Sequence, residues 1–272
     1  MSRIMTPQQC RDFQAEVWQA YADWGRDLPW RTEVADPYAI LVSEIMLQQT
    51  QVSRVITKFQ EFLSHFPTMQ CLADASQMEV IQVWQGLGYN RRARFLHQTA
   101  QIVSYEYGDI LPASQDELRR LPGIGPNTAG SIATFVYNQP TVFIETNIRT
   151  VFLHRFFSGS HSVADSQILP IIAHTLDQTN PRQWYWALMD YGAHIKQTVG
   201  NISRRSQHYV PQSPFQGSRR QVRGKVVRLL AESRHTYAQL QTWVSDPRLA
   251  DVLGDLEKER LIARQGKYYL PA

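Results

Sequence analysis

The sequence predicts an all-α body followed by a small domain of three helices and a β-hairpin. Apolar residues recur at helical spacing in eight stretches of the body, and no stretch before Gly217 alternates as a surface strand does. With 43% apolar residues among 272, the chain can bury a sizeable core. We expect a body over residues 1–200, a linker over 201–217 and a tail domain over 218–272.

The eight helical stretches of the body are separated by turn-forming residues such as Pro122-Gly123. In chain order they are Thr6 to Gly25, Tyr38 to His65, Gln77 to Gly86, Arg91 to Tyr107, Gln115 to Leu121, Asn127 to Tyr137, Asn147 to Phe157 and Gln183 to Lys196. The following segment is polar and contains Pro211 and Pro214, which is typical of a linker.

In the tail, helices are expected over Arg219 to Ser233, Tyr237 to Val244 and Arg248 to Leu261. The stretch Ile262 to Leu270 alternates around Gly266 and predicts a hairpin. This order resembles a winged-helix module, a variant of helix-turn-helix.

Charge is unevenly distributed along the chain. Residues 218–272 hold 11 Lys/Arg against 6 Asp/Glu, which leaves 17 against 18 for the rest. The first tail helix carries Arg219, Arg220, Arg223, Lys225 and Arg228. We therefore expect the tail to be a sequence-independent, salt-sensitive clamp on an anionic polymer such as DNA.

Cysteine content and hydropathy exclude several classes of protein. Cys10 and Cys71 are the only cysteines and lie 61 positions apart, so neither a disulfide framework nor a clustered metal site is expected. No window approaches 18 consecutive apolar residues, and the first residues do not form a signal peptide. A cytoplasmic, nucleoid-associated location is expected.

The string LPGIGPNTAG, Leu121 to Gly130, carries the chemistry most directly. Pro122, Gly123, Ile124 and Gly125 predict a tight hairpin, followed by a helix whose first amides point outward. Such a hairpin can seat a DNA phosphate, with Thr128 in the first helical turn beside it. The alternative is a plain turn, but an acidic residue, Glu145, follows Gly125 after 20 positions.

Five ordered strings together resemble the helix-hairpin-helix (HhH-GPD) DNA glycosylases, which include endonuclease III, and most closely the adenine DNA glycosylases of the MutY family. They are LPWR at Leu28, DPYAILVSEIMLQQTQV at Asp36, QGLGYNRRARFLHQTAQ at Gln85, LPGIGPNTAG at Leu121 and ETNIRTV at Glu145. The resemblance covers roughly Trp24 to Tyr191 and implies a six-helix-barrel-like subdomain plus a helix-hairpin-helix subdomain.

The resemblance implies roles for particular residues. Glu44 stands where adenine glycosylases carry the acid that protonates the leaving base; as an alternative it is an exposed helix glutamate. Gln48, Gln49 and Tyr89 resemble residues that enter the duplex beside the flipped base, although a core tyrosine remains the alternative for Tyr89. Residues matching the base pocket are Trp30, Arg31, Asn127 and Asn147.

The sequence departs from the family pattern in three places. Lys196 stands where the family carries the first of four cluster cysteines, so we expect no iron-sulfur cluster and no other cofactor, with packing and basic residues Lys196, Arg204 and Arg205 taking its place. Arg204 and Arg205 are also expected to contact DNA phosphates, with a solvated polar loop as the alternative. Asn127 replaces the lysine nucleophile of bifunctional relatives, so strand cleavage is not expected. Glu145 replaces an aspartate: it either stabilises the sugar cation or only caps a helix.

The function expected is hydrolysis that releases a flipped, mispaired adenine, opposite 8-oxoguanine or guanine, by a monomer acting on double-stranded DNA in base excision repair. The 55-residue tail is shorter than the domain with which the family reads 8-oxoguanine and differs from it in kind, so 8-oxoguanine, guanine and other mispair partners of adenine all stay open. Two alternatives stay open: a glycosylase for hypoxanthine, uracil or an alkylated purine, and a catalytically silent DNA-structure-binding protein.

Overall fold

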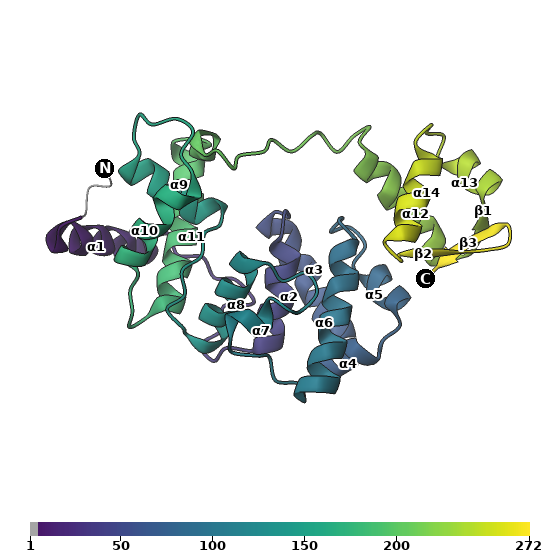
Figure 1. Ribbon diagram of the computed structural model, residues 1–272, viewed down its shortest axis with the longest axis horizontal. Coiled ribbons are helices and arrows are strands. Elements are labelled where there is room, and N and C mark those ends of the chain that lie inside the picture. The colour runs from purple at the N-terminus through teal and green to yellow at the C-terminus, as the bar shows by residue number, and fades with distance from the viewer. Residues whose placement is uncertain (1–4) are drawn as a thin grey trace. The chain divides into compact units, whose positions relative to one another are not determined.

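The computed structural model describes residues 5–272 (Figure 1). The chain divides into two compact units. The first unit consists of the chain up to Asp36, Ala113–Arg119 and Ile124–Pro211. The second consists of Pro37–Pro112, Arg120–Gly123 and Gln212–Ala272. The region expected as a body over residues 1–200 therefore contributes to both units, and the tail belongs to the second.

The first unit is entirely helical in its regular structure. Its helices are α1 (Pro7–Trp24), α7 (Gln115–Leu118), α8 (Pro126–Tyr137), α9 (Thr146–Phe156), α10 (Asp165–Thr175), α11 (Pro181–Thr198) and the 3₁₀ helix η1 (Ile202–Arg205). Helix α1 begins at a capping box of Thr6 and Gln9, with Pro7 in its first turn. Helices α1, α9 and α11 contact one another, and Phe13, Phe152 and Trp184 meet in the core between them.

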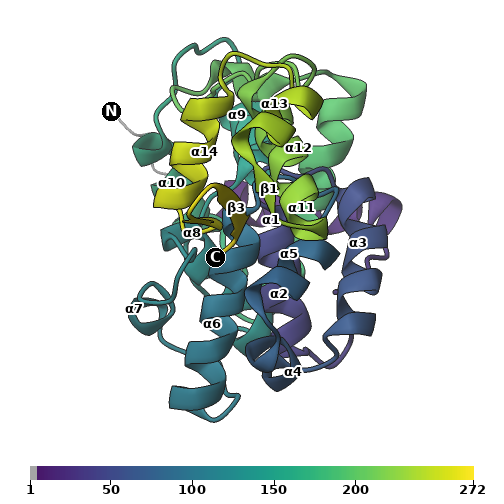
Figure 2. The same cartoon turned by 90° about the vertical axis from the view of Figure 1, so that its right-hand side faces the viewer.

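The body part of the second unit contains five helices, α2 (Pro37–Leu47), α3 (Val52–His65), α4 (Met69–Asp74), α5 (Gln77–Val83) and α6 (Arg91–Tyr107). Helix α6 contacts α2, α4 and α5, which lie beside it in Figure 2. Helix α2 is the most apolar element of the group, with a single half-buried position between Tyr38 and Met46. It therefore forms the centre of this core.

The tail has α12 (Arg219–Glu232), β1 (His235–Thr236), α13 (Tyr237–Trp243), α14 (Leu249–Lys258), β2 (Ile262–Gln265) and β3 (Tyr268–Pro271). The strands form an antiparallel sheet in the order β1-β3-β2, and Gly266 turns the hairpin with φ +61°. The three helices and the hairpin lie where the sequence predicts them. Identification with a winged-helix module stays a prediction.

The elements differ from the expected ones in several places. The stretch from Tyr38 to His65 is two helices, because the chain reverses at Gln49 with a positive φ of 57°. Helices α4 and α10 lie outside the predicted stretches: α4 has only six residues, and Pro170 lies inside α10, where proline is normally disfavoured. Residues 202–205, expected at the start of the linker, form η1, in which Ile202 and Ser203 are buried, and they belong to the first unit.

None of the helices over residues 5–272 is both long and apolar enough to cross a membrane.

Candidate active site

The predicted hairpin lies between α7 and α8, and its backbone requires glycine at one position. Gly123 has φ +79°, and a β-carbon there would lie 2.9 Å from Phe95 Cβ. Gly125 caps α8 in an extended conformation, and Pro126 occupies the first turn. Because Gly125, Pro126 and Asn127 are exposed, the amides at the start of α8 are open to an anion, as a phosphate seat requires.

Side chains around the hairpin mostly serve the fold. The Pro122 carbonyl accepts a hydrogen bond from Thr99 Oγ1 at 2.9 Å, and the Gly123 carbonyl accepts one from Gln48 Nε2 at 3.3 Å. Ile124 is buried and Thr128 is half-buried. Apart from Thr128, these predicted DNA contacts can therefore involve backbone groups but hardly side chains.

Glu44 occupies a distinctive position on α2. Between Tyr38 and Met46 every residue is buried except Glu44, which is half-buried, and its neighbours Ser43 and Ile45 are each 1% exposed. A carboxyl group at such a site is partly shielded from water while remaining reachable. The role of Glu44 as the acid stays a prediction.

The residues predicted to enter the duplex lie at two tips in the second unit. Gln49 is exposed and has φ +57°. Tyr89, which follows Gly88 in the chain, has φ +47°. Left-handed backbone is rare for residues other than glycine and is found where the surrounding structure enforces it. Since the Gln48 side chain binds the Gly123 carbonyl, Gln49 is the better candidate of the two glutamines.

Tyr89 is half-buried rather than part of the core, and the tail reaches it. Its hydroxyl accepts a hydrogen bond from Gln212 Nε2 at 2.5 Å and another from Arg220 Nη1 at 3.0 Å. The Arg220 guanidinium also lies 5.7 Å from the centre of the tyrosine ring. A tyrosine entering the stack would have to exchange these partners for DNA.

Glu145 is the N-cap of α9 in the first unit. Its Oε1 accepts hydrogen bonds from the amides of Asn147 and Ile148, both at 2.7 Å. The capping role that the sequence left as an alternative is therefore present. It does not exclude the catalytic one, because both amides bind the same carboxylate oxygen and the other oxygen makes no hydrogen bond within residues 5–272.

Lys196 is joined to the same helix start. Its Nζ donates to Asn147 Oδ1 at 2.6 Å. Burial lowers the pKa of Lys196, and the nearby charge of Glu145 partly offsets that effect. Gly192, one turn earlier on α11, lets the helices approach so closely that a β-carbon would lie 2.2 Å from the Asn147 carbonyl oxygen. Asn147 therefore serves to link α9 and α11 here.

Asn127 is also tied to the segment that leads to Glu145. Its Oδ1 accepts a hydrogen bond from the amide of Ile144 at 3.4 Å. The first unit thus brings together three predicted residues, Asn127, Glu145 and Asn147, around the start of α9.

Trp30 and Arg31 have surroundings that the sequence did not predict. Trp30 is buried, and Arg31 makes two hydrogen bonds to Asp190, at 2.7 and 2.9 Å, with a side chain only 5% exposed. The Arg31 guanidinium also lies 5.5 Å from the ring of Trp186. This geometry favours a structural role for Arg31 over a direct contact with a base.

The loop from Lys196 to Tyr209 does not suit an iron-sulfur cluster. Cys10 and Cys71 belong to different units, and residues 5–272 contain no group of three or more side chains that could hold a metal ion. The loop is instead fastened by polar contacts: Ser203 Oγ lies 2.9 Å from Thr150 Oγ1, and Val163 pairs with Ser206. Arg204 is exposed and Arg205 half-buried, so both can reach an external phosphate.

The cations of the first tail helix are mostly engaged within the protein. Arg219 pairs with Asp255 at 2.5 Å and Arg223 with Glu259 at 2.6 Å, while Lys225 donates to the Trp243 carbonyl. Arg220 binds Tyr89. Carboxylates thus compensate two of the five cations of this helix, and the expectation of a basic clamp rests on Arg220, Lys225 and Arg228.

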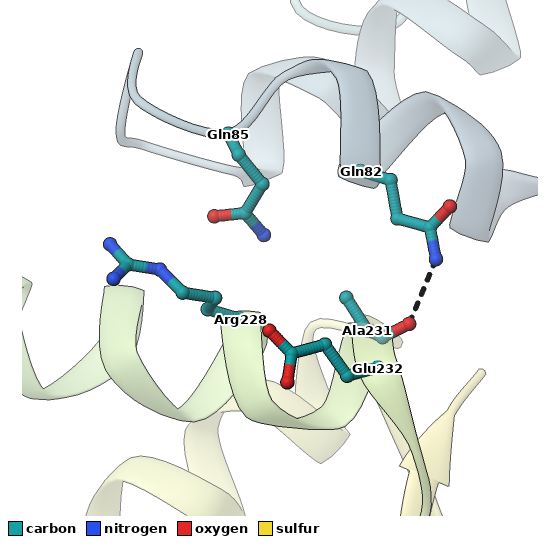
Figure 3. A pocket seen from close by; sticks show the side chains of 5 residues that line it. All are labelled: Gln82, Gln85, Arg228, Ala231 and Glu232. Carbon is teal, nitrogen blue, oxygen red and sulfur yellow. Dashed lines mark hydrogen bonds between the residues drawn. The ribbon is translucent and has the colours of Figure 1, made fainter.

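The remaining cation, Arg228, borders an open cavity of about 410 Å³ between α5 and α12 (Figure 3). Gln82 Nε2 closes one side by donating to the Ala231 carbonyl at 2.8 Å. The tail thus contacts the rest of the second unit next to the loop that carries Tyr89, so the linker is not its sole connection.

Sequence reasoning missed one buried residue of the second unit, Arg92. It makes six hydrogen bonds to oxygen atoms of the segments that carry Gln49 and Tyr89. Its helical register with buried Leu96 and Ala100 places it on the apolar face of α6, and this was the available signal. The sequence around these two positions does not show that Arg92 has these contacts and that Arg91 does not.

Comparison with known proteins relates the chain to base excision DNA repair proteins. The profile of HhH-GPD superfamily base excision DNA repair proteins matches residues 42–167. An adenine DNA glycosylase of Mycolicibacterium smegmatis is 36% identical over 252 residues, which cover 83% of this chain and 84% of the relative. The adenine DNA glycosylase of Mycobacterium tuberculosis is 32% identical over 296 residues, covering 98% and 96%.

Solved structures confirm the fold. A thermostable thymine-DNA glycosylase superposes with a TM-score of 0.60 at 22% identity, covering 68% of this chain and 87% of that one. A trapped covalent intermediate of endonuclease III with DNA gives 0.58 at 18% identity, covering 78% and 92%. The chain belongs to the adenine DNA glycosylase family of the HhH-GPD superfamily, and it is a base excision DNA N-glycosylase.

Proposed function

We propose that this enzyme removes adenine mispaired with 8-oxoguanine or guanine by hydrolysing the bond between the base and its sugar. The relatives that cover most of the chain are named adenine DNA glycosylases. The observation that carries the proposal is Glu44, the half-buried carboxyl group in the otherwise buried stretch from Tyr38 to Met46.

Glu44 acts as the general acid. Adenine is a poor leaving group unless it is protonated, and a partly shielded carboxyl group can retain its proton at neutral pH and deliver it to N7 of the base. The surrounding apolar helix supplies that shielding.

Glu145 stabilises the sugar cation that develops as the base leaves, and water then completes the reaction. Its carboxylate is oriented in advance by the two amides at the start of α9. An electrostatic partner that is already fixed needs no rearrangement during the reaction, which is where such groups contribute most.

Two further properties belong to the proposal. The enzyme is monofunctional, because the amide of Asn127 cannot form a Schiff base with the sugar. It also works without an iron-sulfur cluster, because Cys10 and Cys71 are its only cysteines, and polar contacts of Lys196 and Ser203 hold the loop from Lys196 to Tyr209 instead.

The test is a single-turnover assay on end-labelled duplexes that carry adenine opposite 8-oxoguanine, guanine, cytosine or thymine, with hypoxanthine and uracil duplexes beside them. Strand breaks at adenine are expected opposite 8-oxoguanine and guanine only, and only after alkali reveals the abasic site. Release of another base and not adenine would overturn the choice of substrate. Breaks without alkali would overturn the monofunctional assignment.

A further inference from the structure

Arg92 is a buried cation without an acidic partner. The residue is 8% exposed, and none of the ion pairs within residues 5–272 includes it. Burial lowers its pKa to about 10, so the guanidinium remains charged at neutral pH. A buried charge of this kind persists only where other groups compensate it.

The compensation comes from six oxygen atoms on two segments of the second unit. Nη1 donates to the carbonyls of Ile45, Met46 and Gln48, at 2.9, 2.8 and 2.6 Å. Nη2 donates to Thr50 Oγ1 at 3.0 Å and to the carbonyls of Leu87 and Gly88, both at 3.2 Å.

The first segment is the C-terminal end of α2, the helix that carries Glu44. Its last carbonyls lack partners within the helix and form the negative end of the helix dipole, which suits a cation. The guanidinium carbon also lies 5.3 Å from the ring of Trp84 and 5.5 Å from that of Tyr89. The charge of Arg92 is thus balanced by dipoles and aromatic faces.

The contacts have a common pattern at the two tips. Arg92 binds the carbonyl of Gln48, in the peptide group that precedes Gln49, and the carbonyl of Gly88, in the peptide group that precedes Tyr89. Both following residues have positive φ, 57° and 47°. The Arg92 guanidinium therefore binds the peptide group immediately before each of these two residues. A backbone with positive φ at a residue other than glycine persists only when its surroundings enforce it.

We propose that Arg92 is a positioning residue that fixes the Gln49 tip, the Tyr89 tip and the end of the Glu44 helix as one rigid element. This inference rests on the proposed function, in which the tips enter the duplex and Glu44 protonates the base. Arg92 touches no reacting atom; it acts through the backbone next to Glu44 and to the two tips.

Lysine cannot replace it. An ammonium group has three donors from one nitrogen, whereas the guanidinium presents donors on two nitrogens that face the two segments. Arg92→Lys keeps the charge, but its ammonium group can bind only one of the two segments at a time. Arg92→Met removes the donor from the carbonyls of both segments. A misplacement of about 1 Å is enough to slow a reaction on the order of 100-fold.

The experiment compares Arg92→Lys and Arg92→Met with Arg91→Met, a control that removes the neighbouring exposed arginine, whose ring contact is to Phe95. Three quantities are measured below each variant's melting temperature: the single-turnover excision rate at saturating enzyme, the affinity for a fully paired duplex, and the fluorescence of 2-aminopurine placed at the target position, which rises when the base leaves the stack.

We expect both Arg92 variants to excise at least about 100-fold more slowly and to lose most of the fluorescence rise. Affinity for the paired duplex should stay within about threefold of the unmodified protein, because the phosphate contacts are unchanged. The control should match the unmodified protein in all three measurements.

Wild-type rate and fluorescence in Arg92→Lys would overturn the inference, as would equal losses in the control. If Arg92→Met does not fold, Arg92→Lys decides alone. If neither variant folds, the role of Arg92 is structural and the inference is also wrong. Failure of the proposed function is seen separately, as an unmodified protein that does not release adenine from any duplex.

Discussion

The sharpest test of the chemistry concerns Glu145, which both caps α9 and is proposed to face the sugar cation. The two roles use different properties of the side chain. Capping needs an oxygen that accepts the amides of Asn147 and Ile148, whereas catalysis needs a negative charge at the right reach. Glu145→Gln keeps the oxygen and removes the charge, and Glu145→Asp keeps the charge and shortens the reach.

The magnitudes separate the two roles. Loss of the charge at the start of a helix costs about 0.3–1 kcal/mol, which lowers Tm by at most about 4 °C for a protein of this size. Loss of a preorganised electrostatic partner costs about 2.7–4 kcal/mol in the transition state, a rate decrease of roughly 100- to 1,000-fold. A small loss of folding stability, seen as a small change in Tm, therefore cannot account for such a loss of rate.

The assay is single-turnover excision from an adenine:8-oxoguanine duplex at 25 °C, with Tm measured on the same preparations. Glu145→Gln should excise at least about 100-fold more slowly with a small change in Tm. Glu145→Asp should retain Tm, because aspartate is a good N-cap, and should still be slow because its carboxylate falls short. Full activity of Glu145→Gln would refute the catalytic role and leave the cap as its only function.

Glu44→Gln is expected to slow excision by about 100- to 10,000-fold, with duplex affinity in a mobility-shift assay unchanged; undiminished excision would remove Glu44 from the mechanism. Purified protein should contain no stoichiometric iron, and four irons per chain by elemental analysis would contradict this. Truncation after Gly217 should lower Tm in calorimetry, because α12 contacts α5. It should also flatten the slope of log affinity against log salt, since only Arg219 and Arg223 of the five α12 cations pair with carboxylates; an unchanged slope would refute the clamp. Finally, burial raises the pKa of the Asp165 carboxyl, but the hydrogen bond and charge of Arg149 outweigh this and bring the pKa below 3.8. Because a lowered pKa stabilises the folded state above the unfolded value, Asp165→Asn should destabilise the protein at neutral pH. In denaturant titrations the difference should shrink as pH falls below about 3.8 and vanish below the folded-state pKa; a difference that does not shrink would have another cause.

The sequence alone determined the helical class, most helix positions and the chemistry of the hairpin, because these depend on neighbours close in the chain. Helix α6 occurs at its predicted residues, Arg91–Tyr107, since its end is set by the left-handed Gly108. The tail hairpin turns at Gly266 for the same reason. Glu44 could be singled out because it is a carboxylate within an otherwise apolar run.

Only the tertiary structure decided which polar side chains are committed to the fold. Arg31 was assigned to the base pocket, yet it binds Asp190, 159 positions away. The cations of α12 were assigned to DNA, yet Arg219 binds Asp255 and most of the others also have partners within the protein. Arg92 was overlooked although it holds carbonyls more than 40 positions away. The physical reason is that helical period and cap residues report which face of a helix is buried, but not which distant groups meet it there; for a buried charge, those distant partners determine whether the site is stable.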